Sequence, residues 1–318
     1  MTSAPFEPVD GLSVDVEDYY QVEAFADRIT PAMWPALPSR VADNTCRVLD
    51  LLGRFGATAT FFVVGWVAER QPQIVREILS AGHELACHSH LHRRVSRLSP
   101  EEFREDTRRA RAAIEDAAGK KVGGYRAPTF SIVPSCLWAL EILAEEGFVY
   151  DSSVFPIRHD LYGMPKAPRF PFRWQLGNET FIYEIPLTTV RVLGCNLPVG
   201  GGGYLRILPM FYTRWAMRQI RQKECQPAQT YFHPWEIDPG QPRLRGTKKS
   251  EFRHYYNLKG MEARLCELLS HAHFVPLGDL LKSRIALGPL PLQKLIPSAA
   301  QPAEHLDSLR PIRDQYKY

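Results

Sequence analysis

The stretch Leu12-Ser13-Val14-Asp15-Val16-Glu17-Asp18 begins with alternating apolar and polar residues and ends in carboxylates. The alternation predicts a β-strand over residues 12–15, because successive side chains of a strand point to opposite faces. A strand that ends in acidic residues is typical of α/β enzymes, which place their chemistry at the carboxyl ends of parallel strands. This stretch therefore predicts a parallel sheet with a site at its carboxyl edge.

The residues that follow alternate between strand and helix patterns. The patterns predict strands at 58–64, 83–87, 122–126, 148–152, 230–233 and 273–277, and helices at 39–55, 73–81, 99–119, 134–146, 207–222 and 251–270. Ser99, Pro100 and Glu102 give the clearest helix start, a capping box with Pro at the first position. Residues 156–180 are rich in Pro and aromatic residues and predict an extended loop. Repeated β-α units predict an α/β fold with a parallel sheet closed into a distorted barrel.

Length and composition exclude several classes of protein. A chain of 318 residues with 45% hydrophobic and 23% charged residues is typical of a soluble globular protein. The net charge of +4 is too small to indicate nucleic-acid binding. Six scattered cysteines without a C-x-x-C pair argue against a zinc ribbon. We expect one barrel domain at 10–283 and a Pro-rich C-terminal tail at 284–318.

Residues 1–10 lack the apolar core of a signal peptide, and the apolar run 57–68 is too short to span a bilayer. The sequence therefore predicts no transmembrane segment and a cytoplasmic or peripheral inner-membrane location.

Two groups of residues have the chemistry of a metal site. Asp15 and Glu17 point the same way on a strand, so one could bind a metal while the other acts as a base. His88 and His92 are four residues apart, and on one helical turn both imidazoles could reach the same ion. Ser89 between them can hydrogen-bond the backbone and hold the turn. Taken alone, the acids could be a solvated loop and the histidines surface residues.

Two further motifs follow predicted strands. In Arg126-Ala127-Pro128-Thr129-Phe130, the guanidinium can orient a carboxylate and Pro128 restricts the loop. Tyr231-Phe232-His233-Pro234-Trp235-Glu236 places a histidine at the end of an aromatic strand. Taken alone, the first motif would be interpreted as a turn with a surface Arg, and the second as a structural His packed in the core.

Together, D-x-E-D, H-S-x-x-H, R-x-P-x-F, Y-D-S-S and a strand-end His resemble, in this order, the polysaccharide deacetylase family, carbohydrate esterase family 4 with its NodB homology domain. The resemblance covers about residues 10–280. It implies a distorted (β/α) barrel of about seven strands and removal of N- or O-acetyl groups from carbohydrates with a divalent metal. The residues of these motifs, together with the glycine run 200–203, look most like those of the exosortase/PEP-CTERM-associated exopolysaccharide subfamily.

The resemblance also implies roles. Asp15 would be the base, oriented by Arg126, and His233 the acid. Glu17 or Asp18 would hold Zn²⁺, or Co²⁺, together with His88 and His92. A backbone N–H just after Arg126 would bind the oxyanion. The substrate would contact residues of two motifs: Pro128, Thr129, Phe130 and Trp235. The acidic opening departs from the family's two adjacent aspartates, and the acidic partner of His233 stays open between Asp151 and Glu184.

The resulting hypothesis is a metal-dependent deacetylase of a carbohydrate, an exopolysaccharide or its precursor, associated with a membrane-bound polysaccharide synthesis complex. Two alternatives remain: a metal-dependent amidase on a small non-sugar amide, and a non-catalytic carbohydrate-binding barrel.

Overall fold

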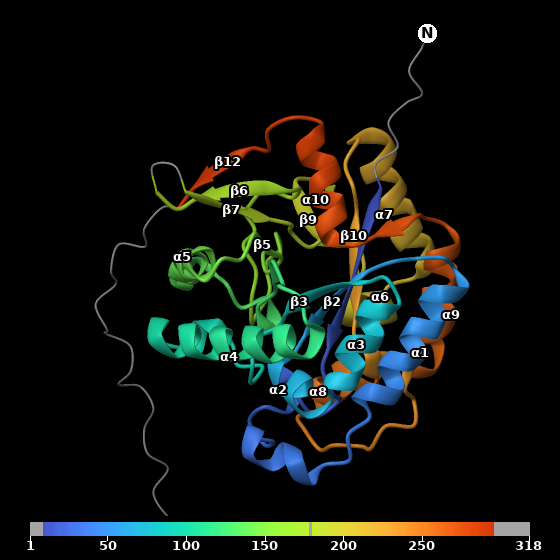
Figure 1. Ribbon diagram of the computed structural model, residues 1–318. Helices are drawn as coiled ribbons and strands as arrows, with labels where there is room; N and C mark the ends of the chain where they lie inside the picture. The colour runs from blue at the N-terminus through green and yellow to red at the C-terminus, as the bar shows by residue number, and fades with distance from the viewer. Residues whose placement is uncertain (1–8, 178–179, 296–318) are drawn as a thin grey trace, which may run out of the picture.

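The computed structural model describes residues 9–177 and 180–295 (Figure 1). Its centre is a run of parallel strands, paired in the order β10 (Gln229–Phe232), β1 (Asp10–Val16), β2 (Thr60–Val63), β3 (Glu84–Cys87), β4 (Gly124–Tyr125), β5 (Tyr150–Asp151) and β7 (Phe181–Glu184). These seven strands confirm the predicted α/β class and the strand number of the distorted barrel. A short strand, β11 (Phe274–Val275), also pairs with β1.

The barrel is open between its first and last parallel strands. Within the described residues, no backbone ladder joins β10 to β7. Side chains close this seam instead: Gln229 of β10 donates from Nε2 to Ser152 Oγ at 3.1 Å and from its backbone to Thr188 Oγ1 at 2.5 Å. Beyond β7 the sheet continues through antiparallel β6 (Phe172–Gln175) and then β12 (Leu292–Lys294).

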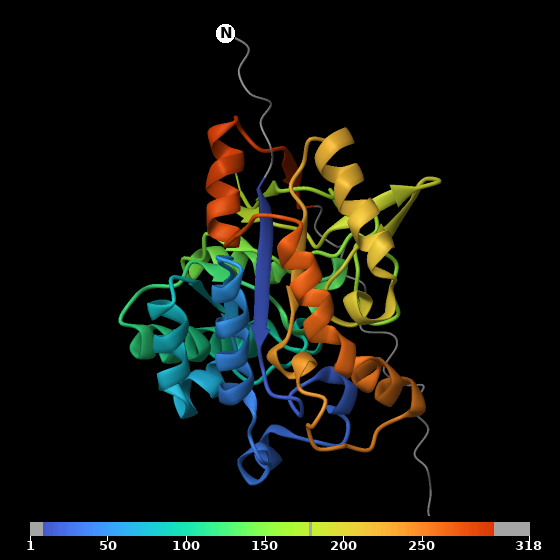
Figure 2. The ribbon, with the colours of Figure 1, turned by 90° about the vertical axis from the view of Figure 1, so that its right-hand side faces the viewer.

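Helices cover the outside of the strands in both views (Figures 1 and 2). They are α1 (Val41–Arg54), α2 (Gly65–Arg70), α3 (Pro72–Ser80), α4 (Pro100–Ala118), α5 (Trp138–Glu145), α6 (Gly202–Ile207), α7 (Met210–Lys223), α8 (Lys248–Tyr255), α9 (Leu258–Ser270) and α10 (Leu277–Ala286). The apolar faces of most of them share one core with the strands; Val48 and Leu52 of α1, for example, are fully buried. The leucines of α10 instead join a second cluster with Phe62, Ala86 and Tyr150. The predicted capping box is present, since Ser99 Oγ accepts from Glu102 N and Glu102 accepts from Ser99 N.

Differences from the predicted elements concentrate after residue 150. The segment 156–180, expected to be one extended loop, contains β6, whose Phe172 and Trp174 are buried with the period of a strand. The helix expected at 251–270 is broken into α8 and α9, because Asn257 adopts a left-handed conformation with φ 53°. The hairpin of β8 (Thr189–Val192) and β9 (Cys195–Pro198) and the helices α2, α6 and α10 were not predicted.

The glycine run 200–203 packs against an aromatic ring. Gly201 and Gly202 have positive φ, and a Cβ on Gly201 would lie 2.2 Å from the ring of Tyr231. Only glycine can bring the start of α6 this close to β10.

The predicted tail begins inside ordered structure. Helix α10 ends at Ala286, and Leu292–Lys294 forms β12 against β6. The remainder of the predicted tail, 296–318, lies outside the described residues, so the division into a 10–283 domain and a tail stays a prediction.

Candidate active site

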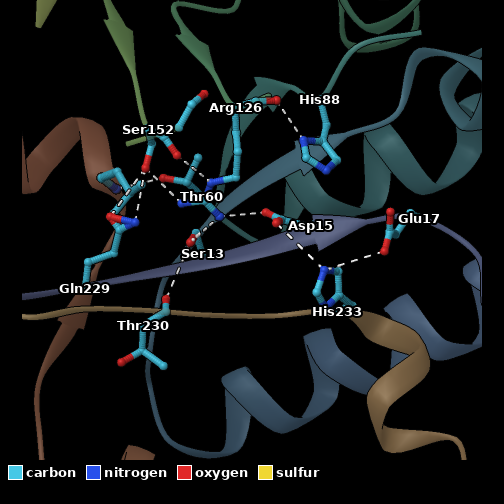
Figure 3. A network of polar contacts seen from close by, with 12 residues as sticks. Ser13, Asp15, Glu17, Thr60, His88, Arg126, Ser152, Gln229, Thr230 and His233 are labelled. Atoms are coloured by element: carbon cyan, nitrogen blue, oxygen red, sulfur yellow. Dashed lines mark hydrogen bonds and ion pairs between the residues drawn. The ribbon is translucent and has the colours of Figure 1, made fainter. Parts of the chain in front are cut away.

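The predicted site residues meet at the carboxyl ends of β1, β3, β4 and β10. Asp15 lies in β1, and Arg126 follows β4. Arg126 Nη1 is 2.6 Å from Asp15 Oδ1, and the two side chains are 0% and 3% exposed (Figure 3). Arg126 also donates to Ser13 Oγ at 2.9 Å, to Ser152 Oγ at 2.9 Å and to Ser152 O at 3.1 Å. The guanidinium is therefore fixed by neighbours in β1 and directly after β5, and it holds one oxygen of Asp15.

Glu17 follows β1 and faces the same pocket as Asp15, as the period of the strand predicted. Its Oε2 is 2.6 Å from His92 Nε2, and its Oε1 accepts a hydrogen bond of 3.2 Å from the indole of Trp235. Burial by itself would raise the pKa of Glu17, but His92 and His233 hold that pKa well below its usual range. Glu17 is therefore an anion in this site.

The two histidines converge, but the expected helical turn does not exist. Residues 88–92 form an irregular loop after β3, in which Ser89 and His92 have φ of 58° and 50°. Ser89 Oγ accepts from His92 N at 2.9 Å, which holds the turn as predicted. The ring centroids of His88 and His92 are 5.1 Å apart. The helix was a wrong expectation because Cys87 ends a strand and the loop turns through left-handed residues.

Glu17, His88 and His92 could hold a metal ion. Their ligand atoms all lie within 4.8 Å of one another, and all three residues are buried. His88 Nδ1 is 2.8 Å from Arg126 O, which leaves Nε2 as the free nitrogen. Glu17 Oε2 is buried and has no hydrogen-bond donor of acceptable geometry among the described residues. One carboxylate and two imidazoles form a donor set that suits Zn²⁺ and related divalent ions.

Asp18, the second candidate for a carboxylate ligand, is used elsewhere. Its carboxylate accepts from Ser39 Oγ at 2.7 Å, from Arg40 N at 2.9 Å and from Val41 N at 3.2 Å. These donors lie at the beginning of α1, so Asp18 caps that helix. It does not belong to the cluster of possible ligands, and the structure therefore favours Glu17.

His233 lines the same pocket, beside Asp15 and Glu17. Its Nε2 is 3.9 Å from Asp15 Oδ2 and 3.5 Å from Glu17 Oε1 (Figure 3). Its Nδ1 is 2.7 Å from Glu236 Oε1. Burial alone would lower the pKa of His233, but the carboxylates around it raise that pKa to about 9.

The acidic partner of His233 is thus Glu236, which the sequence analysis missed. Pro234 starts a 3-10 turn, η6 (Pro234–Ile237), that brings residue 236 back to residue 233. The signal was present in the motif His-Pro-Trp-Glu, since Pro favours the first turn of a helix. Glu236 Oε2 is itself 2.5 Å from Arg206 Nε, and both side chains are buried. No sequence pattern pointed to Arg206.

Asp151 and Glu184, the two expected partners of His233, lie instead on neighbouring strands β5 and β7. Asp151 Oδ1 accepts from Ser153 Oγ at 2.6 Å, and Glu184 Oε1 accepts from Val154 N at 3.1 Å. Burial raises the pKa of Asp151 to about 6 and that of Glu184 well above its usual range. Both expectations are wrong, because these buried carboxylates interact with each other, and Glu236 is the carboxylate at His233 Nδ1.

The backbone N–H expected to bind the oxyanion is not that of Ala127, the first residue after Arg126. Ala127 N donates to Ser153 Oγ at 2.8 Å, and Pro128 has no N–H. Thr129 is the next residue; it lines the pocket in a left-handed conformation with φ 56°, and its N–H has no acceptor among the described residues. Thr129 N–H is therefore the first free donor after Arg126.

The pocket above these residues has a volume of about 590 Å³. Of the residues expected to contact substrate, Thr129, Phe130 and Trp235 line it, whereas Pro128 is buried and does not line it. Trp235 stacks on His233 with a centroid distance of 5.1 Å and on His254 with 4.2 Å. Tyr162 and Tyr204 add aromatic surface to the wall.

Comparisons with known proteins agree with this geometry. Residues 33–143 match the family described as polysaccharide deacetylase, and residues 152–282 match a domain of unknown function, DUF3473. The expected resemblance to the deacetylase family is thereby confirmed. The exosortase-associated subfamily is not tested by these matches.

Curated relatives match shorter stretches. A chitooligosaccharide deacetylase of Bradyrhizobium sp. (strain ANU 289) is 33% identical over 97 residues, 30% of this chain and 42% of the relative. A peptidoglycan-N-acetylglucosamine deacetylase of Bacillus cereus is 40% identical over 62 residues, 20% of this chain and 29% of the relative. The chain thus spans less than half the length of these relatives.

Among solved structures, a Mycobacterium smegmatis protein described as a polysaccharide deacetylase aligns with a TM-score of 0.60 at 20% identity, over 91% of this chain and 95% of that one. This likeness shows the fold. In the part of the chain that the structure describes, no helix is both long and apolar enough to cross a membrane.

Proposed function

We propose that this chain, whose residues 33–143 match the polysaccharide deacetylase family, is a hydrolase that removes acetyl groups from a carbohydrate with a divalent metal, Zn²⁺ or Co²⁺. The observation that carries the proposal is the convergence of three buried side chains, Glu17, His88 and His92, beside the Asp15–Arg126 pair and His233. These residues come from four separate motifs, and a carbohydrate-binding barrel without catalysis would not need them together.

The metal site has a clear chemical role in such a reaction. A divalent ion bound there supplies Lewis-acid polarisation of the acetyl carbonyl and lowers the pKa of water. His88 can offer Nε2 because its Nδ1 faces Arg126 O, and contacts of this kind orient ligand rings.

Asp15 is placed to take a proton from water. Arg126 holds Oδ1, so Oδ2 is the oxygen left for the proton, on the side that faces His233. A carboxylate fixed in this way needs no reorientation during the reaction, which is how positioned bases contribute to rate.

His233 is placed to give a proton to the leaving nitrogen. Its Nδ1 faces Glu236, which fixes the ring and leaves Nε2 toward the pocket. Arg206 fixes Glu236 from the far side. His233 is therefore oriented by two buried charged side chains in succession, Glu236 and then Arg206, rather than by a single contact.

The tetrahedral oxyanion needs a fixed donor, and Thr129 N–H is the available one. Its left-handed backbone conformation is uncommon for a β-branched residue, and strain of this kind clusters at functional sites. A backbone N–H aimed at a developing negative charge stabilises the transition state more than the ground state.

Acetate release tests the proposal. The purified protein, loaded with Zn²⁺ or Co²⁺, should release acetate from N-acetylglucosamine oligomers, lose this activity in excess chelator and regain it with added metal. O-acetylated sugars and simple cyclic amides serve as further substrates. Acetate released only from O-acetylated sugars would exclude N-deacetylation, and hydrolysis of the amides alone would favour the amidase alternative. Binding of oligomers without any acetate release would favour the carbohydrate-binding barrel.

We further propose that the natural substrate is an exopolysaccharide or its precursor, processed at the inner membrane beside a polysaccharide synthesis complex. The residues of the four motifs resemble those of the exopolysaccharide-associated subfamily, and this resemblance supports the proposed substrate and location. Cells that lack the protein should make exopolysaccharide with a higher acetyl content, and the protein should sediment with the membrane fraction. An unchanged acetyl content would count against this substrate.

A further inference from the structure

We infer that the pocket is a closed well that receives the end of a glycan, so that the protein deacetylates a terminal sugar rather than sugars inside a long chain. This inference rests on the proposed function and adds the substrate class. It follows from the contacts in the wall of the pocket, where five segments each line the pocket and each contact the next.

The first links join the N-terminal part of the chain to its neighbours. Glu23, in η1 (Glu23–Phe25), pairs with Arg94 at 3.1 Å and with Arg97 at 3.5 Å, at η3 (Val95–Arg97). On its other side η1 contacts α8, where the rings of Phe25 and His254 are 5.0 Å apart. No gap therefore separates η3, η1 and α8 at the level of these residues.

The next links join α8 to the 156–164 loop. Asp160 in this loop pairs with Lys249 at 2.5 Å and with Arg253 at 3.4 Å. Its neighbours His159 and Tyr162 stack with a centroid distance of 3.8 Å and both line the pocket. The loop is thus tied to α8 on the rim rather than packed away from it.

The last links return to the start. Tyr162 contacts Phe130 in η4 (Pro128–Phe130), with ring centroids 5.7 Å apart. Ser131, directly after η4, accepts a hydrogen bond of 2.9 Å from Val95 N in η3. Val95 and Ser131 are buried, as are Phe25 and His254, so the circuit η3, η1, α8, the 156–164 loop, η4 and back to η3 closes the wall of the pocket below its mouth.

A wall that is closed on all sides restricts the substrate. A groove that binds the interior of a polymer needs two openings, one for each direction of the chain. Here the metal ligands lie at the bottom, with Glu17 2% and His92 9% exposed. The volume of about 590 Å³ falls in the range of roughly 300–1,000 Å³ that is usual for pockets of small ligands. Only a chain end can then carry its acetyl group to the floor.

Three of the five segments lie outside the part that matches the deacetylase family, residues 33–143. The 156–164 loop and α8 belong to the domain of unknown function, residues 152–282. We therefore assign to this domain, besides His233, the wall that selects chain ends.

The test compares chain lengths and positions. N-acetylglucosamine oligomers of two to six sugars and a soluble acetylated polymer are incubated with the metal-loaded wild type, and the free amines are located by mass spectrometry after labelling one end. We expect one deacetylated terminal sugar per chain and a rate per chain that does not rise with length. Free amines at internal sugars of the hexamer would overturn the inference.

Opening the rim should relax this selectivity. Asp160→Asn removes both links to α8 from an exposed residue, so the fold should be unaffected. Loss of a small exposed ion-pair cluster should raise the population of the opened rim about fivefold. The ratio of polymer to oligomer activity should therefore rise by the same factor. Lys282→Met, which removes an exposed pair with Asp279 remote from this rim, is the matched control and should leave the ratio unchanged. An unchanged ratio in Asp160→Asn would count against the rim as the selector.

Binding separates this inference from the proposed function. Calorimetry with the Asp15→Asn variant compares a hexamer with a hexamer that carries bulky groups at both ends. The closed well predicts binding of the first and at least tenfold weaker binding of the second. Equal affinity would overturn the closed well even if acetate is released, whereas absent acetate release with end-selective binding would overturn only the catalysis.

Discussion

Replacing Asp15 by Asn removes one charge of a buried ion pair and leaves the other. Arg126 is 0% exposed and would keep only neutral hydrogen-bond acceptors: Ser13, Ser152 and the amide oxygen of the new Asn. Breaking a buried pair in this way costs about 3–5 kcal/mol of stability. The remaining acceptors, and the ring of Phe62 at 4.1 Å from the guanidinium, place the expected loss near 3 kcal/mol.

Activity and metal content should respond differently to this change. Loss of the base should lower turnover by about 10²–10⁴-fold. Metal affinity should stay within a factor of about ten, because Asp15 is not among the clustered ligand atoms. The assay is acetate release alongside metal content by mass spectrometry and denaturant unfolding. Asp10→Asn, the same change at the other end of β1, is the control and should keep full activity.

Two outcomes would refute the reasoning about Asp15. If Asp15→Asn loses its metal while Glu17→Gln keeps it, the roles of base and ligand are exchanged. If Asp15→Asn keeps full turnover, the base lies elsewhere and the Asp15–Arg126 pair is structural.

Glu17→Gln should lose metal first, with partial rescue of activity by excess metal, whereas Asp18→Asn should keep its metal and lose about 1 kcal/mol of stability as a helix cap; the reverse result would make Asp18 the ligand. His233→Ala should lower turnover by about 10²–10⁴-fold at normal metal content, and unchanged turnover would make His233 structural. Burial raises the pKa of Asp10 from 3.8 to about 6, so folded protein binds more protons than unfolded between these values. The contribution of Asp10 to stability should therefore fall by about 3 kcal/mol as the pH rises from about 4 to 6. The difference in unfolding free energy between wild type and Asp10→Asn should follow that curve; a flat difference would contradict it.

Local patterns predicted the first half of the barrel well. Strands 12–15, 58–64 and 83–87 correspond to β1, β2 and β3, and the capping box at Ser99 marks the start of α4. These elements are determined by short-range physics: apolar periodicity and backbone hydrogen bonds within a few residues. Later predictions also matched at α7, β10 and β11, but the helix expected at 251–270 was wrong because Asn257 has a left-handed backbone between α8 and α9.

The sequence by itself determined the site chemistry, because motif residues of the right types follow successive strands whose carboxyl ends must meet. Only the tertiary structure decided which of the three acidic residues has which role. Asp15, Glu17 and Asp18 differ little in sequence, yet one faces Arg126, one faces the histidines and one caps α1. The sequence likewise did not predict the Glu236–Arg206 pair or the closed rim. They depend on which distant segments come within a few ångströms of each other, and the periodicity of a single segment carries no information about that.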